Sequence, residues 1–301
     1  MVANKKKLIV VVGPTAVGKT ALAIRLAKYF NTEIISADSR QFYKEMSVGT
    51  AKPDSTELAQ ARHHFIDSHS IVQEYSAGDF ERDALALLDS LFKNHDHVVM
   101  VGGSGLFVRA VCEGLDDLPK APEEIRESLN AIFQQKGIAP LQARVKEIDP
   151  VFFAKADIQN PQRLIRAIEV FEATGRPFSD FQKRSLTDRH FQVITVGLNM
   201  EREELYDRIN KRVDQMVTSG LLVEAQQLIG HREKAALRTV GYAEIFDYLD
   251  GKYSFSNAVS LIKQNSRRYA KRQITWFKKY GNTRWFTPLD WDSIVTYIKG
   301  D

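Results

Sequence analysis

The chain has few of the features that mark disulfide-bonded, zinc-binding or membrane proteins. Its 301 residues contain one cysteine, Cys112, so no internal disulfide can form and no Cys-x-x-Cys pair is present to hold zinc. No apolar run approaches the ~20 residues that cross a bilayer. We therefore expect an intracellular, cytoplasmic protein that does not enter a membrane.

Positive and negative charges nearly balance over the whole chain. Lys and Arg total 42 and Asp and Glu total 38, so the formal net charge is +4. A nucleic-acid site must therefore arise from the placement of basic residues and not from their number. Hydrophobic residues make up 44% of the chain, which is ordinary for a globular protein and excludes wholesale disorder.

Acidic residues are missing from one long stretch near the C-terminus, between Gly251 and Leu289. A helix is expected over residues 256–280, and one side of it carries a basic stripe of Arg267, Arg268, Lys271 and Arg272. Stripes of this kind bind phosphate backbones, and the alternative is a solvated basic face whose aromatic neighbours pack in the core. We expect the arginines to contact RNA and Trp276 mainly to pack.

The first third of the chain alternates short β-branched runs with helical patterns. The expected strands are residues 8–12, 33–37 and 98–101, and the expected helices are 21–30 and 79–92. Continuous apolar strands between helices predict an α/β fold, with a parallel sheet covered by helices on both faces. Ligands of such sheets bind at the carboxyl ends of the strands.

A phosphate-binding motif lies between the first expected strand and helix. The segment Gly13-Pro-Thr-Ala-Val-Gly-Lys-Thr20, called here the phosphate loop, fits G-x-x-x-x-G-K-[ST] in the structural context that the motif requires. Backbone N–H groups of such a loop and of the following helix point at an anion. Lys19 adds a positive charge, and Thr20 can place a hydroxyl on Mg²⁺. The motif predicts a phosphate site without identifying the phosphates.

Two usual companions of a nucleotide-hydrolysing loop are absent. The strand over residues 98–101 ends in Gly102-Gly-Ser-Gly105 instead of a Mg²⁺-binding Asp, and no Asn-Lys-x-Asp signature for guanine occurs. The sequence therefore does not support an NTP-driven motor or switch. Asp38 ends the second expected strand near the loop, where it could bind Mg²⁺, act as a general base or only cap a turn.

The middle of the chain has a different character. From about residue 119 to 189 we find helical patterns and turn signals but no convincing strand, and one helix is bounded by Asn160, Pro161 and Gly175. The sequence predicts a P-loop NTPase-like α/β core formed by residues 1–118 and 190–301, and a mostly helical insertion domain over 119–189. A strand over 191–198 returns to the sheet, and further helices are expected over 202–219 and 221–228.

An ordered series of motifs continues along most of the chain: Gly13–Thr20, Ala37-Asp-Ser-Arg-Gln41, Val48-Gly-Thr-Ala-Lys-Pro53, Val101-Gly-Gly-Ser-Gly-Leu106, Asn160-Pro-Gln-Arg-Leu-Ile-Arg-Ala167, Val240-Gly-Tyr242 and Ala270-Lys-Arg-Gln-Ile-Thr-Trp-Phe277. This series resembles the bacterial tRNA dimethylallyltransferases, also called tRNA isopentenyltransferases (the IPP transferase family). The resemblance implies a prenyltransferase that uses Mg²⁺ and moves a dimethylallyl group from dimethylallyl diphosphate to the 6-amino group of the adenosine just 3′ of the anticodon. It also implies that the phosphate loop holds the prenyl diphosphate and not ATP, which accounts for the missing companions.

The resemblance assigns roles to individual residues. Asp38 matches the general base, Lys19 and Thr20 are further catalytic residues, and Thr20 is the expected Mg²⁺ ligand. The implied diphosphate-binding residues are Gly13, Pro14, Thr15, Ala16, Val17, Gly18, Lys19, Thr20, Arg208 and Arg212. The implied tRNA-binding residues are Asp38, Ser39, Arg40, Gln41, Ser104, Arg126, Gln162, Arg163, Leu164, Ile165, Arg166, Arg238, Tyr242, Arg267, Arg268, Lys271 and Arg272.

Some positions and functions stay open at this stage. Ser104 stands where the family often has Thr, so a hydroxyl is kept, whereas Phe107 replaces the usual Tyr and has none. Arg208 could close over the diphosphate or belong to a solvated helix face. Two other functions remain as alternatives, an ATP-dependent kinase of a nucleoside or metabolite and a non-enzymatic RNA-binding protein with a vestigial loop. The expected partners are tRNA and dimethylallyl diphosphate, and the expected state is a monomer.

Overall fold

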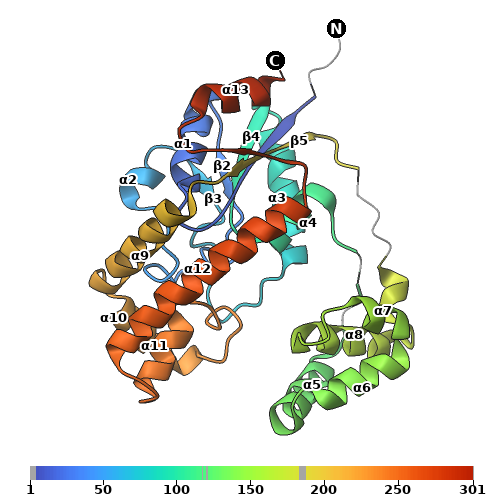
Figure 1. The fold of residues 1–301 in the computed structure, drawn as a ribbon. Helices are drawn as coiled ribbons and strands as arrows, with labels where there is room; N and C mark the ends of the chain where they lie inside the picture. The colour runs from blue at the N-terminus through green and yellow to red at the C-terminus, as the bar shows by residue number, and fades with distance from the viewer. Residues whose placement is uncertain (1–4, 117, 120, 183–187, 301) are drawn as a thin grey trace. The chain divides into compact units, whose positions relative to one another are not determined.

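The computed structural model describes residues 5–116, 118–119, 121–182 and 188–300 (Figure 1). The chain divides into two compact units, which we call the core unit (residues 1–114 and 188–301) and the helical unit (residues 115–187). These limits lie within four residues of the boundaries expected from the sequence.

The core unit is built on a parallel sheet of six strands, in the order β3-β2-β4-β1-β5-β6. Its central strand β1 pairs with β4 on one side and β5 on the other, and its residues 8–12 are completely buried. Burial on both faces explains why the strand is a continuous apolar run. The strands are β1 (Lys7–Val12), β2 (Ile34–Ser36), β3 (His63–His64), β4 (His97–Val101), β5 (Gln192–Leu198) and β6 (Thr283–Phe286).

Helices cover both faces of this sheet, as the sequence predicts. One face packs against apolar residues of α1, α9 and α13, and the other packs against α3 and α4. The helices of the core unit are α1 (Lys19–Tyr29), α2 (Ser55–Leu58), α3 (Ala77–Leu91), α4 (Gly105–Glu113), α9 (Arg202–Thr218), α10 (Leu221–Gln227), α11 (Tyr242–Leu249), α12 (Phe255–Lys279) and α13 (Trp291–Lys299), with a 3₁₀ turn η2 (Ile229–His231).

The long helix α12 runs along the carboxyl edge of the sheet, below the strands in the view of Figure 1. Its N-terminal half packs with α9, α10 and α11 in a separate apolar cluster that contains Val213, Leu221, Ile245 and Ile262. This arrangement brings the helix with the basic stripe next to the edge where parallel sheets bind their ligands.

The helical unit contains α5 (Glu123–Lys136), α6 (Ala139–Ile148), α7 (Pro150–Lys155), α8 (Pro161–Thr174) and the 3₁₀ turn η1 (Phe178–Phe181), and its described residues form no strand. The predicted limits of α8 are confirmed. The Asn160 side chain accepts from the N–H of Arg163 at 3.3 Å, and Gly175 ends the helix at a φ of +69°.

Candidate active site

The phosphate loop connects β1 to α1 in a tightly constrained conformation. Gly13 has a φ of +143°, and a Cβ at that position would lie 2.5 Å from the carbonyl oxygen of Leu198, so only glycine fits. Ala16 adopts a left-handed φ of +64°, which costs about 1–2 kcal/mol for a residue with a side chain. Because α1 begins at Lys19, the unpaired N–H groups of its first turn belong to the loop.

A cavity of about 690 Å³, called here the loop cavity, lies at the carboxyl edge of the sheet. It is lined by the phosphate loop, the segment after β2, and residues of α9 and α12. The sequence-predicted residues in its lining are Thr15, Ala16, Gly18, Lys19, Thr20, Asp38, Ser39, Arg40, Gln41, Arg208 and Arg212. The structure thus brings the predicted base together with most of the predicted diphosphate residues.

Three residues of the phosphate loop do not line this cavity. Gly13 packs against the end of β5, and the Val17 side chain is completely buried in the core. The Pro14 carbonyl accepts a hydrogen bond of 2.8 Å from the Lys19 ammonium. The structure thus shows Gly13, Pro14 and Val17 shaping the loop, while the other five residues of the loop line the cavity.

Two partly buried cations, Lys19 and Arg212, and two carboxylates, Asp38 and Glu57, interact at the loop cavity. Burial, and next the neighbouring Arg212, lower the pKa of Lys19 to about 7, while Asp38 acts in the opposite direction. Burial also lowers the pKa of Arg212, whose Nη2 donates to the carbonyl of Ala51 at 3.1 Å. An anion in the cavity would stabilise the charged forms of Lys19 and Arg212, and so offset the effects of burial and of their mutual repulsion.

Asp38 and Arg208 are two further polar residues of the lining. The Asp38 carboxylate accepts from the backbone N–H of Arg40 at 3.1 Å through Oδ1. Arg208 is partly exposed, with Nη1 at 3.9 Å from the Glu204 carboxylate. The Arg208 guanidinium also lies beside the phosphate loop. A Cβ added to Gly18 would be 3.8 Å from Nη2 of Arg208.

One wall of the loop cavity is held by a carboxylate that the sequence did not single out. Glu224 of α10 accepts from the backbone N–H groups of Ser47, Val48 and Gly49 at 2.8, 2.8 and 2.9 Å. It also accepts from the hydroxyl of Tyr242 at 2.6 Å. A side chain at Gly49 would lie 2.6 Å from the Tyr242 ring, so glycine is required there. The Val48–Pro53 motif is thereby fixed at the cavity.

The prediction that Tyr242 binds tRNA is wrong. Its side chain is completely buried, and its hydroxyl is used by Glu224. Burial raises its pKa, and the contact with Glu224 adds to this effect. Tyr242 supports the wall of the cavity from behind.

We predict that Glu224→Ala lowers the free energy of unfolding by about 3 kcal/mol, because three backbone donors lose their acceptor. Tyr242→Phe is the matched control, which removes one hydrogen bond and should cost about 1 kcal/mol. Urea unfolding of both variants measures the difference. Equal losses in the two variants would show that Glu224 does not hold the wall through its backbone contacts.

Two further predicted tRNA residues make internal contacts. Ser104 Oγ accepts from the N–H of Ser39 at 2.9 Å and donates to its hydroxyl at 3.0 Å, which ties the end of β4 to the end of β2. The Gln41 amide donates to the carbonyls of Thr50 and Ala51 at 3.3 Å. Ser104 does not line the loop cavity, so its hydroxyl serves to position Ser39, and Gln41 lines the cavity with its amide already bonded.

The predicted residues of the helical unit separate into two sets. Leu164 and Ile165 are buried in its apolar core, so the expectation that they contact tRNA is wrong. Gln162 and Arg163 are exposed in the first turn of α8. The other two, Arg126 and Arg166, form ion pairs with the buried carboxylate of Glu169 at 2.5 and 3.4 Å, and Arg126 remains half exposed.

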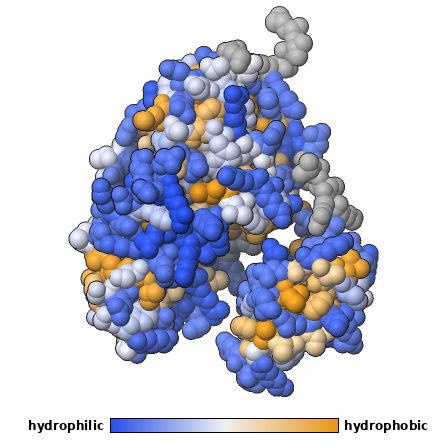
Figure 2. All heavy atoms as spheres, in the orientation of Figure 1, coloured by the Kyte–Doolittle hydropathy of each residue, from blue (hydrophilic) through white to orange (hydrophobic). Residues whose placement is uncertain are grey.

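The basic stripe on α12 is only partly free for a ligand. Arg267 turns toward α9, where its Nη1 donates to Asn210 Oδ1 at 2.7 Å. Its guanidinium is therefore less available to a ligand than the side chains of Arg268, Lys271 and Arg272. The remaining stripe residues are exposed, and Figure 2 shows a largely hydrophilic surface over α9 and α12. Trp276 packs against the core, as expected. Arg238 lies outside the cavity lining and pairs with Glu233 at 2.7 Å.

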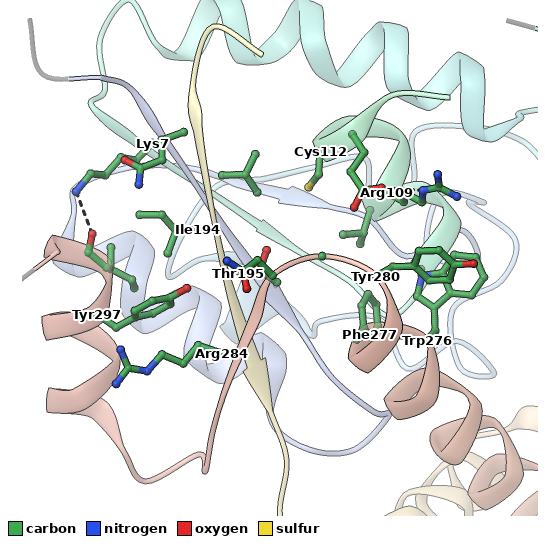
Figure 3. A pocket seen from close by; sticks show the side chains of 18 of the residues that line it. Lys7, Arg109, Cys112, Ile194, Thr195, Trp276, Phe277, Tyr280, Arg284 and Tyr297 are labelled. Atoms are coloured by element: carbon green, nitrogen blue, oxygen red, sulfur yellow. Dashed lines mark hydrogen bonds and ion pairs between the residues drawn. The ribbon is translucent and has the colours of Figure 1, made fainter. Parts of the chain in front are cut away.

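A second cavity of about 570 Å³ lies between α4, β5, the end of α12 and α13 (Figure 3). Its basic side chains have partners inside the protein. Lys7 Nζ donates to the carbonyls of Ile298 and Lys299, and Arg109 pairs with Glu113 at 2.9 Å. Burial raises the pKa of the Cys112 thiol to about 12, which disfavours the thiolate. The predicted phosphate-loop residues and Asp38 line the loop cavity and not this one.

Two polar residues of α12 that line the loop cavity were missed by sequence reasoning. Gln273 and Tyr269 face the turn after β4, although Gln273 lies inside the Ala270–Phe277 motif. Burial, and next the charge of Asp38, raise the pKa of Tyr269 to about 12. A polar residue on the apolar side of a helix was the signal that could have found them.

Two features are absent from the described part of the chain. No group of three or more His, Cys, Asp or Glu residues there could hold a metal ion. Among the helices of those residues, none combines the length and the apolar character that crossing a bilayer requires.

Comparisons with known proteins agree on one family. A model of the IPP transferase family matches residues 41–280. The tRNA dimethylallyltransferase of Christiangramia forsetii is 53% identical over 279 residues, which cover 93% of this chain and 92% of the relative. The tRNA dimethylallyltransferase of Cytophaga hutchinsonii is 51% identical over 294 residues, which cover 98% and 97%.

Solved structures give the same result. The tRNA isopentenylpyrophosphate transferase of Bacillus halodurans is 39% identical, with a TM-score of 0.70 and 98% of each chain covered. A eukaryotic dimethylallyltransferase, described as acting on tRNA, is 25% identical with a TM-score of 0.77, over 96% of this chain and 76% of that one. The chain therefore belongs to the IPP transferase family, among the bacterial tRNA dimethylallyltransferases.

Proposed function

We propose that the chain transfers a dimethylallyl group from dimethylallyl diphosphate to the 6-amino group of the adenosine just 3′ of the anticodon, position 37 of tRNA. The bond from C1 of the prenyl group to the diphosphate oxygen breaks, and its electron pair leaves with the diphosphate. A bond from the adenine nitrogen to C1 forms. One proton of the amino group passes to Asp38.

The observation that carries this proposal is the shared lining of the loop cavity. The phosphate loop, which includes Lys19, lines a single space together with Arg212 of α9 and the carboxylate of Asp38. An anionic leaving group and a proton acceptor are both needed for attack by a weakly basic amine on an allylic carbon. The printed names of the relatives, which specify dimethylallyl transfer and tRNA, agree with this chemistry.

The leaving group is assigned to the loop. Lys19, Arg212 and the N–H groups at the start of α1 would neutralise the charge that grows on the diphosphate as the bond breaks. An oxygen donor for Mg²⁺ is available beside them, because Thr20 lines the same cavity. Mg²⁺ takes much of its coordination from phosphate oxygens and water, so this single side-chain donor fits it. When bound there, the ion would supply further charge neutralisation.

The base must reach an amino group whose lone pair is delocalised into the purine ring. General-base help from Asp38 is worth ~10²–10⁴-fold in such reactions. A stacked adenine cannot enter the cavity, so the nucleotide must be extruded from the anticodon loop. Apolar lining residues can exclude water from the prenyl group, and these are Ile66, Val101, Met216, Val240 and Ile262.

The tRNA backbone is assigned to exposed basic residues outside the cavity. Lys271 and Arg272 follow one another on α12 and have no ion pair with a carboxylate in the described part of the chain. On the helical unit, Gln162 and Arg163 are the exposed members of their motif. Each of these side chains can contact a phosphate without reading sequence.

We predict that the double variant Lys271→Ala, Arg272→Ala weakens tRNA binding and lowers the slope of log affinity against log salt by about 1 to 2, because up to two phosphate contacts are lost. Lys93→Ala is the matched control, since this exposed lysine follows α3 at the other edge of the sheet. Titrations at three salt concentrations give the slopes. An unchanged slope in the double variant would remove the basic stripe from the tRNA site.

The proposed function is tested by transfer from labelled dimethylallyl diphosphate to unmodified tRNA in the presence of Mg²⁺. We expect label on the adenosine 3′ of the anticodon after nuclease digestion. A tRNA that carries inosine at this position lacks the amino group and should receive no label. Label on the inosine tRNA, or at another nucleotide, would contradict the proposed acceptor.

A further inference from the structure

One buried side chain of α12 connects the phosphate loop to the turn after β4. Gln273 is only 5% exposed. Its Oε1 accepts from the backbone N–H of Thr15 at 2.8 Å, and its Nε2 donates to the carbonyl of Gly103 at 3.0 Å. Both groups lie at the carboxyl edge of the sheet, next to the cavity where the diphosphate is proposed to bind.

The two contacts use both ends of the Gln273 amide. The Thr15 N–H needs an acceptor and the Gly103 carbonyl needs a donor, and the amide oxygen and NH₂ group supply one each. Space is restricted as well, because a Cβ at Gly103 would collide with Nε2 of Gln273. The pair of bonds is therefore specific in chemistry and in shape.

The Thr15 contact stabilises the strained part of the loop. Thr15 directly precedes Ala16, whose left-handed φ of +64° is unfavourable for a residue with a side chain. Strained backbone persists only where its surroundings determine it. The contact also uses the Thr15 N–H, so that the N–H groups from Ala16 to Thr20 are the ones left for a phosphate.

We propose that Gln273 is a positioning residue that holds the phosphate loop in the conformation that binds the prenyl diphosphate. It acts through Thr15 and touches neither the reacting carbon nor the amine. The same side chain makes the loop geometry depend on α12, the helix whose exposed residues are assigned to tRNA. This inference rests on the proposed function of the loop as the diphosphate site.

The first test compares Gln273→Leu with Gln264→Leu, a substitution at an exposed glutamine of the same helix. Leucine leaves both groups without a partner, and the cost of even one buried unsatisfied group corresponds to about a tenfold to hundredfold change in an equilibrium constant. We expect the affinity for inorganic pyrophosphate, measured by calorimetry, to fall by that factor only in Gln273→Leu. In turnover, the KM for dimethylallyl diphosphate should rise while the KM for tRNA stays within about twofold.

The second test uses Gln273→Glu, which separates positioning from packing. An ionised carboxylate accepts from Thr15 but cannot donate to Gly103, whereas the protonated acid restores both bonds. The charged and titratable groups around this position are Lys19, Asp38 and Tyr269. We expect the pyrophosphate affinity of Gln273→Glu, relative to the unmodified chain at each pH, to recover as the pH falls from 8.5 to 5.5. Gln273→Leu should show no recovery.

The outcomes distinguish this inference from the proposed function. If Gln273→Leu is folded and binds pyrophosphate as the unmodified chain does, Gln273 does not position the loop. If Gln273→Glu shows no recovery at low pH, the two hydrogen bonds are not the cause of the effect. If the unmodified chain binds pyrophosphate but transfers no prenyl group, the proposed function fails while the role of Gln273 in the loop stands.

Discussion

Replacing Asp38 with asparagine should reduce prenyl transfer by ~10²–10⁴-fold, the usual contribution of a general base. Asparagine keeps an oxygen that can accept from the Arg40 N–H, so the local turn should survive. The substitution removes the carboxylate that we propose accepts the amine proton. Single-turnover rates with saturating tRNA and dimethylallyl diphosphate measure the effect on the chemical step.

Two controls separate the loss of a base from the loss of a neighbouring charge. The carboxylate of Asp38 raises the pKa of Lys19, so its removal also changes the diphosphate site. Pyrophosphate and tRNA affinities of Asp38→Asn should therefore be measured together with turnover. Transfer within tenfold of the unmodified rate, with both affinities unchanged, would exclude Asp38 as the base.

Replacing Lys19 with alanine should lower transfer by ~10²–10³-fold, because preorganised charge near the leaving group is worth that much in comparable sites. The loss should appear in the affinity for pyrophosphate and in the rate of the chemical step, and tRNA affinity should change little. Lys211→Ala is the control, since this exposed lysine lines the rim of the same cavity. Equal losses in the two variants would show that cavity charge in general, and not the buried ammonium, matters.

The lowered pKa of Lys19 leads to a further prediction, which concerns the protons taken up when pyrophosphate binds. With a pKa of about 7 in the free protein, this amine is mostly neutral at pH 8. A bound anion favours the charged form, so pyrophosphate binding at pH 8 should take up protons, and this uptake should decrease as the pH falls below 7. Calorimetry in two buffers of different ionisation enthalpy measures the number of protons. Lys19→Ala should lack the part of the uptake that exceeds the titration of pyrophosphate itself.

Local sequence patterns were sufficient for most of the fold. The predicted strands were confirmed because each is a buried apolar run, and the predicted helices were confirmed because their apolar residues recur with helical period. The ends of these elements differ from the prediction by no more than two residues. The strand order, with β5 returning beside β1, depends on contacts between distant segments and could not be obtained from local patterns.

Two of the missed elements are short edge strands with weak local patterns. The edge strand β3 consists only of His63 and His64, and β6 is four residues long. Short edge strands carry little periodicity, since only part of their surface is buried. The helix α11 begins inside the Val240–Tyr242 motif, where the sequence was interpreted as a binding segment instead of a helix start.

The candidate site shows the same division between local and non-local information. The phosphate loop and Asp38 are local motifs, and the structure places them on one cavity. The role of Glu224 was not predictable, because its backbone partners lie about 175 residues earlier in the chain. Tyr242, Leu164 and Ile165 were wrongly assigned to tRNA, because a motif match does not distinguish an exposed contact from a buried support.

The central claim is that this phosphate loop serves a prenyl diphosphate and not a nucleoside triphosphate. Parallel reactions of the protein with unmodified tRNA and Mg²⁺, one with labelled dimethylallyl diphosphate and one with labelled ATP, test it most directly. We predict that prenyl label is transferred to tRNA with one pyrophosphate released per label, and that ATP is not consumed. Consumption of ATP with a phosphorylated product, and no prenyl label on tRNA, would contradict the claim and favour a kinase.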